Sequence, residues 1–212
     1  MTKQPRKRHK HSFRAPCLYT LLIELHPDEL QPAIWRRMVV DGRVSLAKLH
    51  HFIQAAFGWT DAHLHAFTIN SIHYMSPNFD DLQDEVFAGM EAQYERKGYL
   101  NRLLAEGDTF VYLYDFGDSW SHVITVEKIE MVENDPHGNA YVAGGERACP
   151  PEDVGGTTGY HEFLETILSN AHSEEAKKLI NWAGGEFNPG MFDRLAANAS
   201  IQRTLWNNWG GK

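Results

Sequence analysis

The sequence predicts an α+β fold: a mainly antiparallel sheet, one amphipathic helix after the first strand pair, and a helical C-terminal part. Two observations predict it. Runs with strand-like composition occupy most of the chain from Leu18 to Val132, and helical spacing of apolar residues dominates from Tyr160 onward. Strands followed by a group of helices are typical of α+β proteins. With 212 residues, 42% of them hydrophobic, the chain is long enough to bury one large core.

The first strand pair and the first helix have the clearest signals. Residues 18–25 (LYTLLIEL) and 33–40 (AIWRRMVV) are rich in strand-forming residues, and the HPDELQP link between them has two prolines. Because proline cannot serve a central ladder, this link predicts a turn between antiparallel strands. In the following SLAKLHHFIQAAFGW, apolar residues recur at steps of three and four. Ser45 is the expected N-cap of this helix, and Gly58 is expected to end it.

Two further pairs of strands follow. HLHAFTIN and IHYMS predict a hairpin around Asn70-Ser71, and DTFVYLYDFG and SWSHVITVEKIEMV predict two longer strands. The second of these alternates between apolar and polar residues, which predicts a sheet with one covered face.

The last 79 residues of the chain divide into a loop and a group of helices. Residues 134–160 are rich in glycine and proline, and they predict a long loop without regular structure. After Tyr160 the spacing predicts three helices. The second begins at the N-cap Ser173 and ends at Gly184, and the third lies within 188–206.

Charge divides the chain into a basic N-terminal arm over residues 1–16 and a single acidic domain over 17–212. We expect 17–170 to form the core of that domain and 171–212 its C-terminal helices. The net charge is −8, although the first 14 residues contain no acid and six basic residues: Lys3, Arg6, Lys7, Arg8, Lys10 and Arg14. An acidic body does not resemble a compact DNA-binding domain, whose binding face is basic. The arm is either a contact for nucleic-acid phosphates or a solvated, disordered end.

The sequence also indicates a cytoplasmic protein. No apolar run approaches the roughly 18 residues that a membrane span requires. The basic N-terminus is not followed by the apolar segment of a secretory signal. The two cysteines, Cys17 and Cys149, make no disulfide framework, so a reducing compartment is expected.

A cluster of polar residues interrupts the two longer strands at LYDFGDSWSH, residues 113–122. A tight turn explains Gly117, through a positive φ, and one aspartate, but not two aspartates beside a histidine. In HLH, His63 and His65 are two apart on an expected strand, so both imidazoles are predicted to face one spot. The predicted site, either a Zn, Mn or Fe centre or an acid–base group, consists of His65, Asp115, Asp118 and His122. The alternative is a set of separate hydrogen-bonded residues, and we interpret the His50-His51 pair on the first helix as structural.

The loop GGERACPPEDVGG, residues 144–156, is the third candidate element. Its prolines stiffen the chain and its glycines allow close approach, so it can present Cys149, Glu152 and Asp153. Neighbouring acids raise the pKa of a thiol, so Cys149 is not expected to be a nucleophile. The alternative is a proline-braced cover over the sheet.

Four segments together resemble the plasmid pRiA4b ORF-3-like family, whose members are often labelled TnpR or resolvase-like proteins of mobile elements. They are ELQPAIWRRMVV, LAKLHHFIQAAFGWTDAHLHAFTI, YLYDFGDSWSHVITVEKI and GGERACPPEDVGGTTGYHEFLETI. The resemblance runs from about Tyr19 to Ile167 and implies a compact α+β domain with no established biochemical activity. The positions that the family shares are His65, Asp115, Gly117, Asp118, Trp120, His122, Cys149, Pro150, Glu152, Asp153 and Gly155.

Two functions are compatible with these features, and whether the protein is an enzyme stays open. The first is a binding or accessory module of mobile elements, which contacts another protein, or DNA through the basic arm. The alternative is a hydrolase that depends on a divalent metal held by the predicted site, with Glu152 or Asp153 as base. Convergence of these side chains on one point favours the metal, and outward-pointing side chains favour a binding face.

Overall fold

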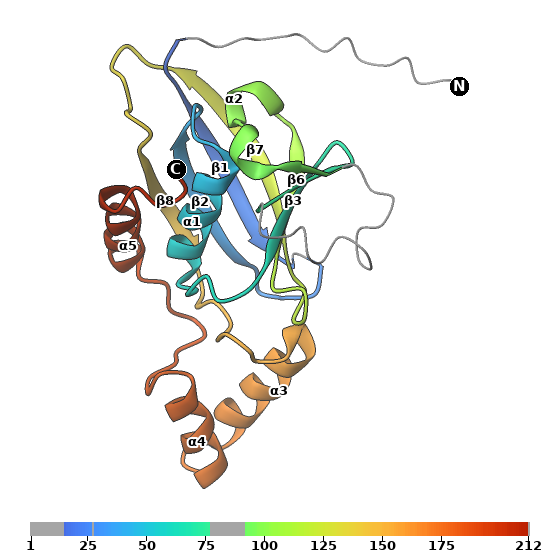
Figure 1. Cartoon of the computed structure of the whole chain (residues 1–212). Coiled ribbons are helices and arrows are strands. Elements are labelled where there is room, and N and C mark those ends of the chain that lie inside the picture. The colour runs from blue at the N-terminus through green and yellow to red at the C-terminus, as the bar shows by residue number, and fades with distance from the viewer. Residues whose placement is uncertain (1–14, 27, 77–91, 212) are drawn as a thin grey trace.

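A computed structural model describes residues 15–26, 28–76 and 92–211, and one eight-stranded sheet forms its centre (Figure 1). The strand order is β5-β4-β3-β6-β7-β1-β2-β8. The paired strands are antiparallel except for β4 and β5, which are parallel. The strands are β1 (Cys17–Leu25), β2 (Ile34–Asp41), β3 (His65–Ile69), β4 (Ile72–Met75), β5 (Ala92–Tyr94), β6 (Thr109–Tyr114), β7 (Trp120–Met131) and β8 (Ala140–Glu146). The predicted α+β class with a mainly antiparallel sheet is therefore confirmed.

The helices take two positions relative to this sheet. The helix α1 lies across one face, α5 lies beside α1 and β8, and α3 and α4 project beyond one end of the sheet (Figure 1). Their bounds are α1 (Leu46–Phe57), α2 (Leu100–Leu103), α3 (Gly156–Ser169), α4 (Glu174–Trp182) and α5 (Arg194–Trp206), with a short 3₁₀ turn η2 (Glu95–Lys97). The predicted helical C-terminal part is thus confirmed as well.

Strand alternation produces the covered face. Along β1, Tyr19, Leu21 and Ile23 are fully buried, and the residues between them are half-buried. The apolar stripe of α1, including Leu49 and Phe52, packs into the same core. Each such side chain stabilises the fold by about 1.5–3 kcal/mol on burial, so the covered face supplies most of the hydrophobic stabilisation.

The predicted helix caps and the predicted hairpin turn, which depend only on residues close in sequence, are confirmed. The Ser45 side chain accepts a hydrogen bond from Lys48 N, and Gly58 ends α1 with a φ of 88°. In the β3–β4 hairpin, Asn70 and Ser71 both have positive φ, as a type I′ turn requires. The Ser173 side chain caps α4 through Ala176 N.

The prediction of an irregular loop over 134–160 is wrong, because this segment contains β8 and the start of α3. The glycine-rich strand β8 pairs with β2, and its glycines allow close packing: a Cβ on Gly145 would lie 2.8 Å from an Arg36 carbon. On the other side, the Asn198 amide of α5 bonds both N and O of Val142. Partners distant in sequence therefore order a segment whose own composition indicates a loop.

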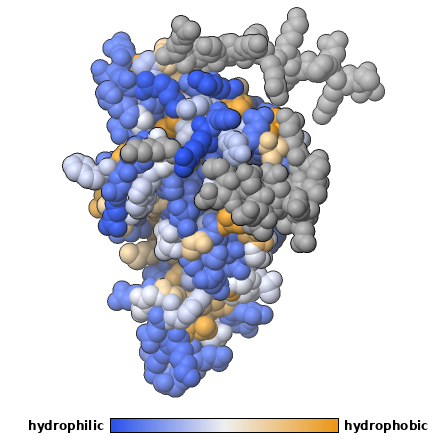
Figure 2. Space-filling view, viewed as in Figure 1, coloured by the Kyte–Doolittle hydropathy of each residue, from blue (hydrophilic) through white to orange (hydrophobic). Residues whose placement is uncertain are grey.

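The surface seen in Figure 2 is mostly hydrophilic, with apolar side chains scattered over it rather than gathered into one area. Among the described residues, no helix is both long enough and apolar enough to span a membrane. The six basic residues of the predicted arm lie outside the described residues.

Candidate functional site

The turn between β6 and β7 is organised by the Asp115 carboxylate. Its Oδ1 accepts hydrogen bonds from the backbone N of Gly117, at 2.9 Å, and of Asp118, at 3.3 Å. The residues with positive φ in this turn are Asp115, at 55°, and Ser119, at 57°. The prediction that Gly117 supplies the positive φ is therefore wrong: the aspartate bonds its own turn and so tolerates the left-handed region.

Asp118 joins this turn to the loop before α3. Its Oδ2 accepts a hydrogen bond from Gly155 N at 3.0 Å, at the start of the helix, where the dipole favours a negative charge. The two segments approach closely, since a Cβ on Gly156 would lie 2.8 Å from the Asp118 carbonyl oxygen. The turn and the proline-braced loop, which the sequence analysis identifies as separate candidates, thus lie side by side.

Where they meet, three carboxylates surround one imidazole nitrogen, and we call this group the His63 cluster: His63, Asp115, Glu152 and Asp153. The Nε2 atom of His63 lies 3.1 Å from Asp153 Oδ1, 3.6 Å from Asp115 Oδ2 and 3.9 Å from Glu152 Oε2. This Nε2 is buried and has no hydrogen-bond partner among the described residues: the Asp115 and Glu152 oxygens lie beyond hydrogen-bond distance, and the nearer Asp153 oxygen makes an ion-pair contact only.

Glu152 is the most firmly held member of the His63 cluster. Its Oε1 accepts hydrogen bonds from Thr60 N at 2.8 Å, from Thr60 Oγ1 at 3.1 Å and from the Tyr114 hydroxyl at 3.1 Å. The Tyr114 pKa is raised by burial first and then by the Glu152 charge, so this phenol remains a donor. By contrast, Asp153 is 71% exposed and free to adjust.

An open groove of about 510 Å³ is lined by the ends of α1 and α4 and by two members of the His63 cluster, Glu152 and Asp153. It is lined by Phe57, Gly58, Trp59, Cys149, Pro150, Pro151, Glu152, Asp153, Trp182, Ala183, Gly184 and Phe187. The Trp59 indole donates to the Pro150 carbonyl at 3.1 Å and stacks on Phe57, which fixes this wall of the groove. A ligand in the groove can therefore reach Glu152 and Asp153 of the cluster.

The prediction that His63 and His65 face one spot is wrong. The strand β3 begins at His65, so His63 lies in the preceding turn and does not follow the alternation of a strand. Its ring joins Asp115 and Asp153, whereas the His65 ring points into the interior, where Nε2 lies 2.7 Å from Glu95 Oε2.

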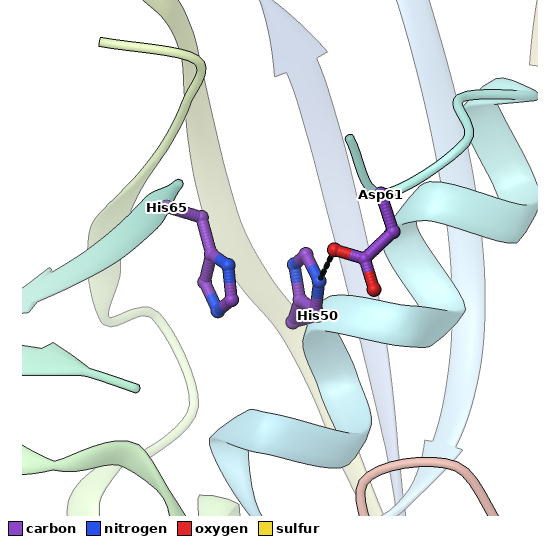
Figure 3. A group of neighbouring side chains, drawn as sticks. All are labelled: His50, Asp61 and His65. Atoms are coloured by element: carbon purple, nitrogen blue, oxygen red, sulfur yellow. Dashed lines mark hydrogen bonds and ion pairs between the residues drawn. The ribbon is translucent and has the colours of Figure 1, made fainter. Parts of the chain in front are cut away.

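A second polar group contains the buried histidines His65 and His50 together with the exposed Asp61 (Figure 3). The two imidazole rings stack with their centroids 3.5 Å apart and an angle of 5° between their planes. Asp61 lies on the far side of His50, where its Oδ1 is 2.7 Å from Nε2 (Figure 3). From the sequence, we interpret the His50-His51 pair as structural, and the contact between His50 and His65 is not anticipated.

His50 closes a ring of hydrogen bonds. The Gln54 amide donates to the Tyr112 hydroxyl at 3.0 Å, and that hydroxyl lies 2.8 Å from His50 Nδ1. In return, Gln54 Oε1 accepts from Asp61 N at 2.9 Å. Burial lowers the pKa of His50 to about 4, so its neutral ring accepts from Tyr112 and donates to Asp61.

This geometry makes the His50 and His65 pair a poor metal site. A metal ion lies near the plane of each imidazole that binds it, and two parallel planes 3.5 Å apart share no such point. Both nitrogens of His50 already have partners. We therefore interpret this group as a polar brace that holds the turn after α1, including His63.

The four residues predicted as metal ligands do not share one point. Asp115 belongs to the His63 cluster, His65 to the buried group, and Asp118 bonds the α3 start. His122 is fully buried among aromatic rings, and burial lowers its pKa to about 3, so it is a neutral core residue. Of the other predicted residues, Glu152 and Asp153 join Asp115 in the cluster.

Cys149 lies in the floor of the groove rather than in the cluster. Its pKa is raised well above the usual value, by burial first and by the Glu152 charge, against an opposing effect of Arg36. The burial of Cys149 therefore favours the protonated thiol over the thiolate.

Comparisons with known proteins identify a family and name no activity. Residues 18–196 match the family described as plasmid pRiA4b ORF-3-like protein. The uncharacterized protein y4hQ of Sinorhizobium fredii is 36% identical over 174 residues, which cover 82% of this chain and 83% of that protein. The crystal structure of MM3350 from Methanosarcina mazei, a protein of unknown function, has a TM-score of 0.72 and 30% identity, and the match covers 86% of this chain and 97% of that one.

None of these three matches has the resolvase-like label that the sequence resemblance suggests. The family match covers well over half of the chain. The matches to the relative and to the solved structure each cover most of both proteins compared. The chain belongs to the plasmid pRiA4b ORF-3-like family.

Proposed function

We propose that the protein binds a divalent metal ion through His63, Asp115 and Asp153 and uses it to hydrolyse a substrate held in the groove. The observation that carries this proposal is the convergence of one imidazole nitrogen and carboxylate oxygens within 4.8 Å of one another. The sequence analysis set the same criterion for the metal-dependent alternative. Asp115 and Asp153 meet it, with His63 in place of the predicted histidines.

The distances suit a small dication. A tetrahedral ion with bonds of about 2.1 Å separates its ligand atoms by about 3.4 Å. The His63 Nε2 lies 3.1 Å from Asp153 Oδ1 and 3.6 Å from Asp115 Oδ2, close to that spacing. One imidazole with carboxylates suits Mn²⁺, Fe²⁺ or Zn²⁺, and a site with three protein ligands keeps a position for water.

Glu152 is the base in this scheme. A dication held there would lower the pKa of a bound water toward neutral pH. That water would add its oxygen to the electrophilic carbon of the substrate as the bond to the leaving group breaks. Glu152, held by Tyr114 and Thr60, takes the water proton and delivers it to the leaving group.

Isothermal titration of Mn²⁺ and Zn²⁺ into chelator-treated protein tests the metal site. We expect one site in the native protein and at least a tenfold loss of affinity in Asp115→Asn and His63→Gln. Asparagine tolerates positive φ and keeps the Oδ1 acceptor of the turn, so Asp115→Asn should fold. The matched control is Asp118→Asn, in the same turn but outside the His63 cluster. Equal affinity in Asp115→Asn, His63→Gln and the control would contradict the proposal.

A binding or accessory module for mobile elements is the second candidate, and the groove is the observation that favours it. Four aromatic side chains and two prolines line this groove, and such a surface can hold a partner without any reaction. In this function the basic arm contacts DNA. Titration with duplex DNA across salt concentrations, with and without residues 1–16, tests the arm: a steep salt dependence that disappears on truncation is expected.

A further inference from the structure

The groove combines aromatic walls with carboxylates at one end. Trp182, at the end of α4, is 51% exposed, and Phe187 also lines the groove. The other two aromatic residues of the lining are Phe57 and Trp59, which stack at a centroid distance of 5.5 Å. Glu152 and Asp153 complete the lining.

The charged residues of this lining are all acidic. No lysine or arginine is among the described residues that line the groove, whereas two acids are. A phosphate or other anion therefore finds no partner here, and it meets repulsion from the carboxylates. A cation gains both from the carboxylates and from the electron-rich faces of the aromatic rings.

We infer that the groove receives the guanidinium group of an arginine side chain carried by a peptide. A guanidinium is planar, so it stacks on an indole face, and its positive charge is attracted by nearby carboxylates. Trp182 offers the exposed face, and Glu152 and Asp153 supply the negative charge that attracts the cation. Binding of arginine is inferred from the groove itself. The hydrolysis of arginine-containing peptides as the substrate class rests on the proposed function.

The inferred ligand is compatible with a metal ion in the His63 cluster. Three carboxylates exceed the charge of one dication, so the end of the groove stays negative when the ion is bound. The guanidinium occupies the aromatic part of the groove, and the peptide carbonyl next to it reaches toward the cluster. Hydrolysis then adds water across the amide bond: the carbonyl carbon gains the oxygen, and the amine leaves with a proton.

The test uses a fluorescently labelled Gly-Arg-Gly peptide and its citrulline counterpart, which is neutral and nearly isosteric. Fluorescence anisotropy is measured on the full chain, both chelator-treated and loaded with Mn²⁺. We expect binding of the arginine peptide that is at least tenfold tighter than that of the citrulline peptide, and that weakens as salt is raised. Equal binding of the two peptides overturns the inference.

Two tryptophan variants distinguish a groove from a general effect of surface aromatics. Trp182→Leu removes the exposed aromatic wall, and we expect at least a tenfold loss of peptide affinity with Mn²⁺ affinity unchanged. Trp206→Leu, on α5, is the matched control: its side chain is 91% exposed and does not line the groove. Equal peptide affinity in the two variants overturns the inference.

The outcomes of the metal and peptide titrations separate the two proposals. Peptide binding without metal binding refutes the hydrolase and supports arginine recognition by the groove. Metal binding at the His63 cluster without selective peptide binding refutes the arginine inference alone.

Discussion

Arg36 offers a sharp test of how the groove is built, because it is a buried guanidinium whose described partners are carbonyl oxygens and aromatic rings. It is 1% exposed, and it donates to the carbonyls of Trp35, Ala56, Glu146 and Arg147. These bonds join the end of α1 to the chain that leaves β8. Burial lowers the pKa of Arg36 to about 10, so the group remains charged at neutral pH.

The change Arg36→Lys keeps the positive charge but removes the planar guanidinium group with its several N–H donors. Lysine has one donor group at the end of its stem, so it cannot reach carbonyls on three separate segments at once. Each buried carbonyl left without a partner costs about 1–3 kcal/mol. We expect the free energy of unfolding to fall by about 2–4 kcal/mol, which corresponds to about 1 M in the urea midpoint for a slope of about 3 kcal/mol/M.

Urea unfolding followed by tryptophan fluorescence measures this change, and the neighbouring arginine provides the control. Arg37 makes a two-bond ion pair with Glu127 at the surface, with a side chain that is 39% exposed. Since exposed ion pairs contribute about 0–1 kcal/mol, Arg37→Lys should move the midpoint by less than about 0.3 M. Equal shifts in the two variants would refute the argument that the fork of Arg36 braces the groove.

Three further predictions concern the polar groups beneath the site. Burial lowers the pKa of His50 to about 4, so the stability it contributes is full above pH of about 6.5 and declines as the pH falls toward 4. Urea unfolding at pH 7 and 5 should show a smaller decline in His50→Gln, and an unchanged decline would contradict this. Tyr112→Phe leaves two buried groups without a partner, so it should destabilise by about 1–3 kcal/mol, whereas Tyr141→Phe, at an exposed position, should not. Asp118→Ala removes the acceptor for Gly155 N and should cost about 1 kcal/mol in thermal unfolding, against no more than about half that for Asp118→Asn.

The predictable parts of the fold depend on local signals. The Ser45 cap, the Gly58 terminator and the alternation of β7 follow from residues close in sequence, and each is confirmed. By contrast, β8 is ordered by β2 and by Asn198 of α5, which lies more than 50 residues away. No local pattern contains that information, so composition alone indicates a loop there.

The same division applies to the site. Asp115, Glu152 and Asp153 could be selected because a turn and a rigid loop contain more acid than their local structure needs. Their histidine partner could not be selected correctly, because HLH looks like strand alternation and the strand begins only at the second histidine. The prediction of His122 as a ligand is wrong, although its place in the alternating pattern of β7 already predicts that it is buried in the core.

Anomalous diffraction from a crystal grown with Mn²⁺ would test the central claim most directly. We predict one strong peak within bonding distance, about 2.0–2.3 Å, of His63 Nε2 and of the Asp115 and Asp153 carboxylates. A crystal with no peak at the His63 cluster, or with its peak at His50 and His65 instead, would contradict the account.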